Sequence, residues 1–81
     1  MTINKRLVAV LGDVFNLRSD QIVPELTKDD VGNWDSLKQM DLVVSLELEF
    51  NIVLEIPDII RMDSVHNIIE ILASKGIARG D

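Results

Sequence analysis

The sequence predicts an all-α protein: a four-helix bundle of three longer helices and one short third helix, with a long first loop. Apolar residues recur at helical spacing in three separate stretches of the chain. The alternating stretch at residues 52–54 has no comparable stretch with which to build a sheet. With 81 residues, the chain has room for a single domain spanning residues 1–81 with one modest core.

The composition is that of a globular protein, and it excludes several kinds of site. Apolar residues make up 47% of the chain and charged residues 27%, which is too apolar for a disordered protein. Only Phe15, Trp34 and Phe50 are aromatic, so the core must consist mostly of Leu, Ile and Val. The chain has no cysteine, which excludes disulfides, thiolate metal sites and a cysteine nucleophile.

The net charge is −6, and it is concentrated in one part of the chain. Residues 35–70 hold eight acidic and two basic side chains, whereas the segments before and after are nearly neutral. Such a surface repels nucleic acid and anionic membranes. We therefore expect no nucleic acid and no membrane among the partners, and instead proteins with basic patches.

No feature of the sequence indicates a membrane or an export route. No apolar run approaches the roughly 20 residues that a membrane-spanning helix needs. Residues 1–6, MTINKR, lack a following signal-peptide core. We expect a cytoplasmic monomer.

The first helix is expected over residues 3–15, with Thr2 as its N-cap. Its core-facing side chains recur at helical spacing: Ile3, Leu7, Val10, Leu11 and Val14. Residues 16–34 keep no period, which predicts a loop of about 19 residues with a short helical turn from Ser19. Five apolar residues should anchor this loop to the bundle: Leu17, Ile22, Val23, Leu26 and Val31.

The second helix is expected over residues 36–50. Residues 36–39, SLKQ, fit a capping box in which the Ser36 hydroxyl accepts from the Gln39 N–H and the Gln39 side chain reaches back. Asp35 also favours the helix start by opposing its dipole. At about 100° per residue, one arc forms an ordinary core face: Gln39, Leu42, Val43, Leu46 and Phe50.

A second apolar stripe runs along the same helix, roughly 145° around from the first. It has four apolar members with two acidic side chains beside them: Leu37, Met40, Val44, Leu48, Asp41 and Glu47. A surface helix in a small domain needs only one apolar stripe. The second stripe is therefore either buried as well or a partner site with an acidic rim.

The rest of the chain predicts two further helices. After an extended stretch at 52–54, Pro57 suits the first turn of a short helix, and Asp58 beside it favours a helix start. Its apolar contacts are expected from Ile59, Ile60 and Met62.

Asp63 or Ser64 should cap a last helix over residues 65–75, with Gly76 just beyond its end. Four side chains of this helix should face inward: Val65, Ile68, Ile69 and Leu72. Residues 77–81 are expected to form a frayed tail. Their last three residues, RGD, match a cell-adhesion tripeptide by chance.

These residues resemble the acyl carrier protein family. The motif is Asp35-Ser36-Leu37, and the resemblance continues through the following helix and the later apolar positions, so it covers essentially the whole chain. The residues that carry it are Leu42-Val43, Leu46-Glu47, Glu49-Phe50, residues 50–54, Met62, Val65 and Ile69. The tripeptide alone is a weak signal of the family. Its position in the chain, together with the chain's length and acidic charge, makes the signal strong.

The resemblance implies a carrier rather than an enzyme, with no catalytic residues of its own. Ser36 would bear a 4′-phosphopantetheine arm as a phosphodiester, and the arm would hold an acyl group as a thioester. Asp35 and Leu37 would flank this site. The implied partners are a phosphopantetheinyl transferase (holo-carrier synthase) and the acyl-loading and acyl-using enzymes of fatty-acid, lipid or secondary-metabolite synthesis.

The resemblance also makes the helix after Ser36 the partner face, with seven members: Asp35, Leu37, Met40, Asp41, Val44, Glu47 and Leu48. Many family members are acidic at the positions of Lys38 and Leu48, so this face is less negative and more apolar than usual. The segment before the motif is one residue longer than is common. Its Trp34 is either typical of specialised carriers or a residue that packs the loop.

Two alternatives stay open. One is an aminoacyl or peptidyl carrier of the same fold, including a D-alanyl carrier; the other is an unmodified helical interaction domain in which Ser36 is only a cap. No metal site is expected, because His66 is the sole histidine and residues 29–35 lack the spacing of a calcium loop. Ser36 has no evident base, so a serine hydrolase is not expected.

Overall fold

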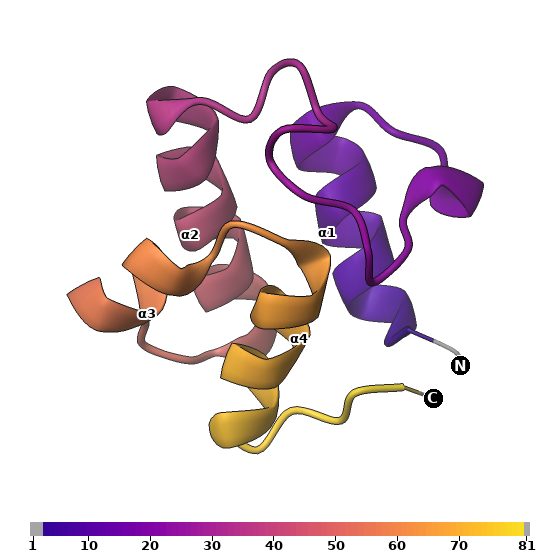
Figure 1. Cartoon of the computed structure of the whole chain (residues 1–81). Helices are drawn as coiled ribbons and strands as arrows, with labels where there is room; N and C mark the ends of the chain where they lie inside the picture. Colours follow the sequence, from indigo (N-terminus) through magenta and orange to yellow (C-terminus); the bar gives the residue numbers. More distant parts are fainter. Residues whose placement is uncertain (1–2, 81) are drawn as a thin grey trace.

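The computed structural model describes residues 3–80 and confirms the all-α, four-helix bundle (Figure 1). Its elements are α1 (Lys5–Phe15), the 3₁₀ turn η1 (Ser19–Gln21), α2 (Ser36–Phe50), α3 (Ile56–Arg61) and α4 (Val65–Ser74). No strand forms within residues 3–80, where the extended pairing is an isolated bridge between Thr27 and Ser64. As predicted, α3 is the short helix and a long loop joins α1 to α2.

α1 begins two residues later than predicted, with Asn4 as its N-cap. The carboxamide oxygen of Asn4 accepts hydrogen bonds from the backbone N–H groups of Arg6 and Leu7. Those N–H groups have no acceptor within the helix, which is why a polar side chain is needed there. Thr2, the predicted cap, lies outside the described residues.

The first loop crosses the bundle and is fastened to the start of α4 (Figure 1). The Val65 N–H donates to the Leu26 carbonyl at 2.9 Å, and the His66 N–H donates to the Pro24 carbonyl at 3.0 Å. Both donors belong to the first turn of α4, whose N–H groups have no intrahelical acceptor. The loop backbone therefore completes the hydrogen bonding of a helix about 40 residues later in the chain.

Four of the five predicted loop anchors pack against the core. Ile22 and Val31 are buried, Leu17 and Leu26 are partly buried, and η1 forms at the predicted helical turn. Val23 is wrong as an anchor, because its side chain is 42% exposed. Ile22 has an extended backbone, and adjacent side chains of an extended chain point to opposite sides.

One core joins α1, α2, α4 and the loop. The predicted inward faces of α1, α2 and α4 are confirmed, except that Gln39 is only partly buried. Seven side chains exposed by 1% or less form its centre: Leu7, Leu11, Leu42, Leu46, Val65, Ile68 and Ile71.

α3 begins at Ile56, which places Pro57 in its first turn as predicted, and the Glu55 N–H donates to the Asp58 carboxylate at 3.0 Å. The prediction of apolar contacts holds for Met62, which is 2% exposed, and for partly buried Ile59. It is wrong for Ile60, whose side chain is 74% exposed. A helix of six residues can turn only one side toward the core, and adjacent residues lie about 100° apart.

α4 follows the prediction, although it ends at Ser74 rather than Lys75. Ser64 is the cap, since its hydroxyl accepts from the Asn67 N–H at 3.1 Å. Gly76 has a φ of 89°, the left-handed conformation that favours glycine just after a helix.

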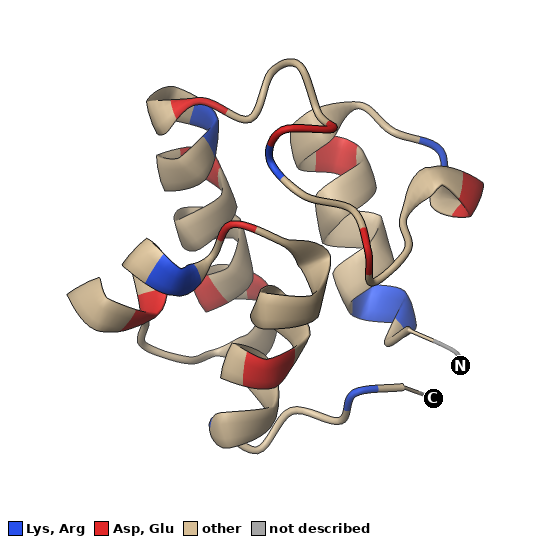
Figure 2. Ribbon diagram, in the orientation of Figure 1, with Lys and Arg blue, Asp and Glu red and all other residues tan. Residues whose placement is uncertain are grey.

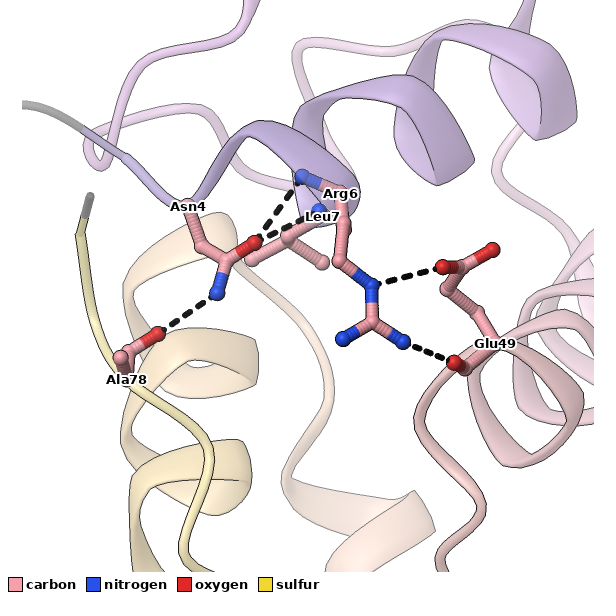
Figure 3. Close-up of polar contacts among 5 residues, drawn as sticks. All are labelled: Asn4, Arg6, Leu7, Glu49 and Ala78. Atoms are coloured by element: carbon pink, nitrogen blue, oxygen red, sulfur yellow. Dashed lines mark hydrogen bonds and ion pairs between the residues drawn. The ribbon is translucent and has the colours of Figure 1, made fainter.

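The predicted frayed tail is wrong for residues 77–80, because they dock onto α1 (Figure 3). The Asn4 N–H donates to the Arg79 carbonyl, and the Asn4 carboxamide donates to the Ala78 carbonyl, both at 2.9 Å. The Arg79 guanidinium also pairs with Glu70 at 2.9 Å. Asp81, the end of the RGD tripeptide, lies outside the described residues.

Arg6 ties the start of α1 to the end of α2 (Figure 3). Its guanidinium donates to the Glu49 carboxylate at 2.7 Å and to the Glu49 carbonyl. The same group lies 4.7 Å from the centre of the Phe50 ring, a cation–π contact. α1 and α2 are therefore joined by charge as well as by their buried apolar faces.

Candidate functional site

Ser36 is the first residue of α2, and it does not cap the helix. The cap is Asp35, whose carboxylate accepts from the Lys38 N–H at 3.0 Å. The predicted capping box of Ser36 and Gln39 is therefore wrong. Ser36 is exposed, and its hydroxyl makes no hydrogen bond to any of residues 3–80. Asp35 satisfies the helix start, which leaves the Ser36 hydroxyl available for chemistry.

The Gln39 side chain joins three parts of the molecule. Its carboxamide oxygen accepts from the Trp34 indole N–H at 2.7 Å. Its amide group donates to the Ile59 carbonyl at 2.9 Å and to the Met62 carbonyl at 3.1 Å. One turn into α2, this side chain therefore holds the end of the first loop against the end of α3.

Trp34 packs the loop against the bundle, which is one of its two predicted roles. Its side chain is 7% exposed, and its ring lies 4.6 Å from the Phe15 ring, centre to centre, tilted by 36°. Burial of the indole is accompanied by a partner for its N–H group, as is usual for buried tryptophan. Trp34 thus shapes the approach to Ser36 from within the fold.

The second apolar stripe of α2 faces outward. Its side chains are exposed by 82% at Leu37, 53% at Met40, 51% at Val44 and 80% at Leu48. The same helix buries Leu42, Val43, Leu46 and Phe50. α2 therefore has two apolar sides, and only one of them is covered within residues 3–80.

The two acidic residues beside the stripe differ in their surroundings. Asp41 is exposed, whereas Glu47 is partly buried and its carboxylate accepts from the Leu54 N–H at 2.9 Å. Glu47 therefore holds the chain that leaves α2 as well as contributing charge. Figure 2 shows acidic residues on α2, α3 and α4, in the part of the chain that the sequence marks as acidic.

Sequence reasoning missed further exposed apolar side chains, which lie between α2 and the end of α3. They are exposed by 68% at Val53, 72% at Ile56 and 74% at Ile60. Extended and single-turn segments carry no long period from which an outward side can be read. A usable signal was the number of isoleucines in α3, since a helix of six residues cannot bury them all.

A pocket of about 400 Å³ opens beside Ser36, where the first loop, the start of α2 and the end of α3 meet. Its lining combines apolar and charged side chains: Trp34, Ile59, Ile60, Met62, Lys28 and Asp63. Asp35, Ser36 and Gln39 complete it on the α2 side. Sequence reasoning did not find this pocket, because its lining comes from three separate segments.

The described residues include neither a cluster that could hold a metal ion nor a helix that could span a membrane. Within residues 3–80, no three His, Asp or Glu side chains are grouped so as to hold a metal ion. His66 is exposed at the start of α4, as expected. In the same part of the chain, no helix has the length and apolar character needed to span a bilayer.

A serine with a free hydroxyl, at the start of a helix whose outer side is apolar with acidic neighbours, suits a group-carrying domain. A family model described as "phosphopantetheine attachment site" matches residues 5–72, from the start of α1 to near the end of α4. The chain belongs to this family. A comparison with curated proteins found no match.

Members of the phosphopantetheine attachment family carry a covalent 4′-phosphopantetheine group, so this chain is a phosphopantetheine carrier. Such domains are modified by phosphopantetheinyl transferases, interact with other enzymes and are generally not catalysts themselves. Membership therefore supports a carrier over the unmodified interaction domain. The predicted partner face has seven residues. Six of them are exposed, at the cap of α2 or along its outer side, and Glu47 is partly buried.

Proposed function

We propose that Ser36 is the attachment residue and that the protein is an acyl carrier. The observation that carries this proposal is the exposed Ser36 hydroxyl, which makes no hydrogen bond within residues 3–80 while Asp35 caps the helix. A phosphodiester at this position would lie at the start of a 15-residue helix, where the dipole favours negative charge. The residues present therefore fit the group that the family carries.

Attachment would form a bond between the Ser36 oxygen and the pantetheine-side phosphorus of coenzyme A. The pyrophosphate bond breaks, adenosine 3′,5′-bisphosphate leaves and the serine proton passes to a base of the transferase. No described residue accepts a hydrogen bond from the Ser36 hydroxyl, so the proposal places that base on the transferase. Once attached, the arm supplies a thiol that holds an acyl group as a thioester.

The exposed side of α2 is proposed as the surface that partner enzymes bind. Leu37, Met40, Val44 and Leu48 would be covered by the partner, while Asp35, Asp41 and Glu47 face its basic patch. The proposed partners are a phosphopantetheinyl transferase and the enzymes that load and use the acyl group in fatty-acid, lipid or secondary-metabolite synthesis. We place this carrier in the cytoplasm as a monomer and as a single domain over residues 1–81.

The aminoacyl or peptidyl carrier stays an alternative with no observation in its favour. Trp34 was the residue that pointed toward specialised carriers, including D-alanyl carriers. Its side chain is buried against Phe15 and bonded to Gln39, which accounts for a tryptophan at this position through packing. The identity of residue 34 therefore does not favour one cargo over another.

Intact mass spectrometry tests the attachment. Purified protein is incubated with coenzyme A, magnesium and a phosphopantetheinyl transferase of broad specificity. We expect the wild type and Ser45→Ala, a control serine on the same helix, to gain the mass of one phosphopantetheinyl group. Ser36→Ala should gain none while keeping its helical circular dichroism. An unchanged mass for the wild type, beside a known carrier that is modified, would contradict the proposal.

A further inference from the structure

The polar atoms of the Gln39 side chain are matched to their surroundings. Its oxygen accepts from the Trp34 indole N–H at 2.7 Å, and its amide group donates to the Ile59 and Met62 carbonyls at 2.9 and 3.1 Å. An indole can only donate and a carbonyl can only accept, so these partners require one acceptor and two donors from residue 39. Glutamine supplies all three on one planar group, whereas glutamate lacks the donors and methionine lacks all three.

The Gln39 bonds act on α3, a helix whose position depends on its neighbours. A helix of six residues is too short to be stable by itself, so contacts with the rest of the protein decide where it lies. The ion pair between Asp58 and Lys75 joins α3 to the end of α4, not to α2. Within residues 3–80, both hydrogen bonds that join α2 to α3 and its C-cap, Met62, come from Gln39.

The two carbonyls that Gln39 reaches lie at the end of α3. Carbonyls in the last turn of a helix have no α-helical partner, so a side chain from another helix can cap them. The Ile59 carbonyl also accepts from the Met62 N–H at 3.1 Å, which closes this end of α3 in a tight turn. Gln39 therefore caps α3 from α2, and its removal would leave these carbonyls with fewer hydrogen bonds.

α3 presents an exposed apolar side chain next to Ser36. Ile60 is 74% exposed, and it lines the same pocket as Ser36 and Gln39. An enzyme that reaches the Ser36 hydroxyl will therefore lie close to Ile60 as well. Covering an exposed isoleucine is favourable, and the gain is largest when the side chain is already held where the partner meets it.

We infer that Gln39 is a positioning residue that fixes α3, and with it Ile60, beside Ser36 for the enzyme that modifies this serine. The inference rests on the proposed attachment at Ser36. Gln39 acts through α3 and takes no part in bond formation. If α3 occupies the competent position for only a fraction of the time, the apparent affinity of the enzyme falls by that fraction. Loss of Gln39 should therefore raise KM for the unmodified (apo) protein and leave kcat unchanged.

Two variants separate the link to α3 from the link to Trp34. Gln39→Glu keeps an acceptor for the indole N–H but has no donor for the carbonyls, and Gln39→Met keeps neither. With a phosphopantetheinyl transferase of broad specificity, both should raise KM by about three- to tenfold, which corresponds to a competent fraction of roughly 0.1–0.3. The added charge of Gln39→Glu would attract a basic enzyme, so it works against the expected rise in KM.

Two-dimensional ¹H–¹⁵N NMR of the apo variants shows whether the change is local to α3. In both Gln39 variants, the backbone signals of residues 56–62 should shift and their amides should exchange faster with solvent. The Trp34 indole N–H should exchange faster in Gln39→Met than in Gln39→Glu, because only the second variant keeps its acceptor.

Asn4→Ala is the control for a general loss of stability. Asn4 caps α1, whose start is tied to the far end of α2 by the bond between Arg6 and Glu49. This variant should therefore destabilise the protein without changing the α3 signals or KM.

A double-mutant cycle tests whether Gln39 acts through Ile60. Ile60→Ala should raise KM in the wild type, and it should raise KM less in the Gln39→Glu background, where Ile60 is no longer held in place. Effects on KM that simply multiply would show that the two residues act independently, which would overturn the inference.

The other results that would overturn the inference leave attachment intact. They are an unchanged KM in both Gln39 variants, a rise in Gln39→Met alone, unchanged α3 signals, or an equal rise in Asn4→Ala. A wild type that gains no mass overturns the proposed function, and this inference falls with it. The mass measurement therefore separates the two failures.

Discussion

Asp35 and Ser36 are neighbours with separate tasks. The Asp35 carboxylate accepts a hydrogen bond from the Lys38 N–H and caps the start of α2, while the Ser36 hydroxyl has no hydrogen-bond partner among residues 3–80. If one side chain both capped the helix and received the phosphopantetheinyl group, modification would remove the cap from the helix. Separation of the two tasks lets the proposed attachment occur without that loss.

Substitutions at this pair should separate stability from attachment. Asp35→Ala should lower the free energy of unfolding by about 0.5–2 kcal/mol, the usual cost of a lost cap, and Asp35→Asn should lower it far less. Ser36→Ala should have almost no effect on stability. Urea unfolding followed by Trp34 fluorescence measures all three. A loss at Ser36→Ala as large as at Asp35→Ala would contradict the capping assignment.

Asp35→Asn also isolates the role of charge in transferase recognition, because asparagine caps helices about as well as aspartate. Slower attachment for this variant at unchanged stability would assign recognition to the carboxylate itself.

α2 carries two apolar sides with different neighbours. One side is buried against the rest of the protein, and the other exposes Leu37 and Leu48 by 80% or more. Burial of the inner side accounts for the position of the helix. The outer side has no structural task within residues 3–80, which is why we assign it to partners.

Alanine substitutions should distinguish the two sides of α2. Leu46→Ala and Phe50→Ala should each lower the free energy of unfolding by roughly 2–5 kcal/mol, because each removes buried volume. Met40→Ala and Val44→Ala should change it by less than about 0.5 kcal/mol but weaken transferase binding. Chemical unfolding and binding titrations measure the two effects. Comparable destabilisation by all four would mean that the outer stripe is buried.

α3 and α4 are joined by an ion pair between Asp58 and Lys75, at 3.0 Å and with both side chains mostly covered. The Glu55 backbone N–H lowers the pKa of Asp58 below its ordinary value of 3.8, and Lys75 lowers it further. The carboxylate is therefore favoured by folding. Its contribution to stability is present above about pH 4 and is lost as pH falls through the lowered pKa.

Asp58→Asn should remove this contribution. At neutral pH we expect the variant to be about 1 kcal/mol less stable, and its stability should fall less steeply than that of the wild type below pH 4. Thermal unfolding from pH 7 to pH 2 measures both. The Arg79 guanidinium also lowers the pKa of Glu70, so Glu70→Gln serves as the comparison for a more exposed pair. Identical acid profiles for wild type and Asp58→Asn would contradict the assignment.

The distribution of charge across the protein suits electrostatic steering of a basic partner enzyme. The acidic excess lies in residues 35–70, which hold eight acidic and two basic side chains. A basic partner would be drawn to the acidic surface before the apolar stripe closes the contact. Asp41 is the better residue to test, because Glu47 also bonds the Leu54 backbone.

Asp41→Lys should slow attachment of the arm at low salt by up to about tenfold. The difference from the wild type should shrink as salt rises, since charges are screened over about 10 Å at 0.1 M. Glu25→Lys makes the same charge change on the exposed first loop and should have little effect. Parallel salt curves for wild type and Asp41→Lys would mean that Asp41 does not steer association.

Glu47→Lys removes the hydrogen bond to the Leu54 backbone as well as a charge. Its effect on attachment must therefore be read beside Glu47→Gln, which removes the charge alone.

The sequence by itself determined the helices, their inward faces and the presence of a second apolar stripe on α2, whereas the tertiary structure showed that this stripe is exposed. These follow from a repeat of 3.6 residues, which is local information and survives in any tertiary context. The resemblance that begins at Asp35-Ser36-Leu37 predicted the family, and the match to the family model confirms it. Boundaries were predicted to within two residues in the helices whose apolar pattern is regular.

Only the tertiary structure decided which polar atoms meet. The Gln39 side chain was expected to reach back to Ser36, but its oxygen accepts from the Trp34 indole N–H and its amide group donates to the carbonyls of Ile59 and Met62, 20 and 23 residues later. Asn4 finds Ala78 across 74 residues, so the tail docks rather than frays. Such choices depend on which carbonyls packing brings within about 3 Å, and no local pattern encodes that distance.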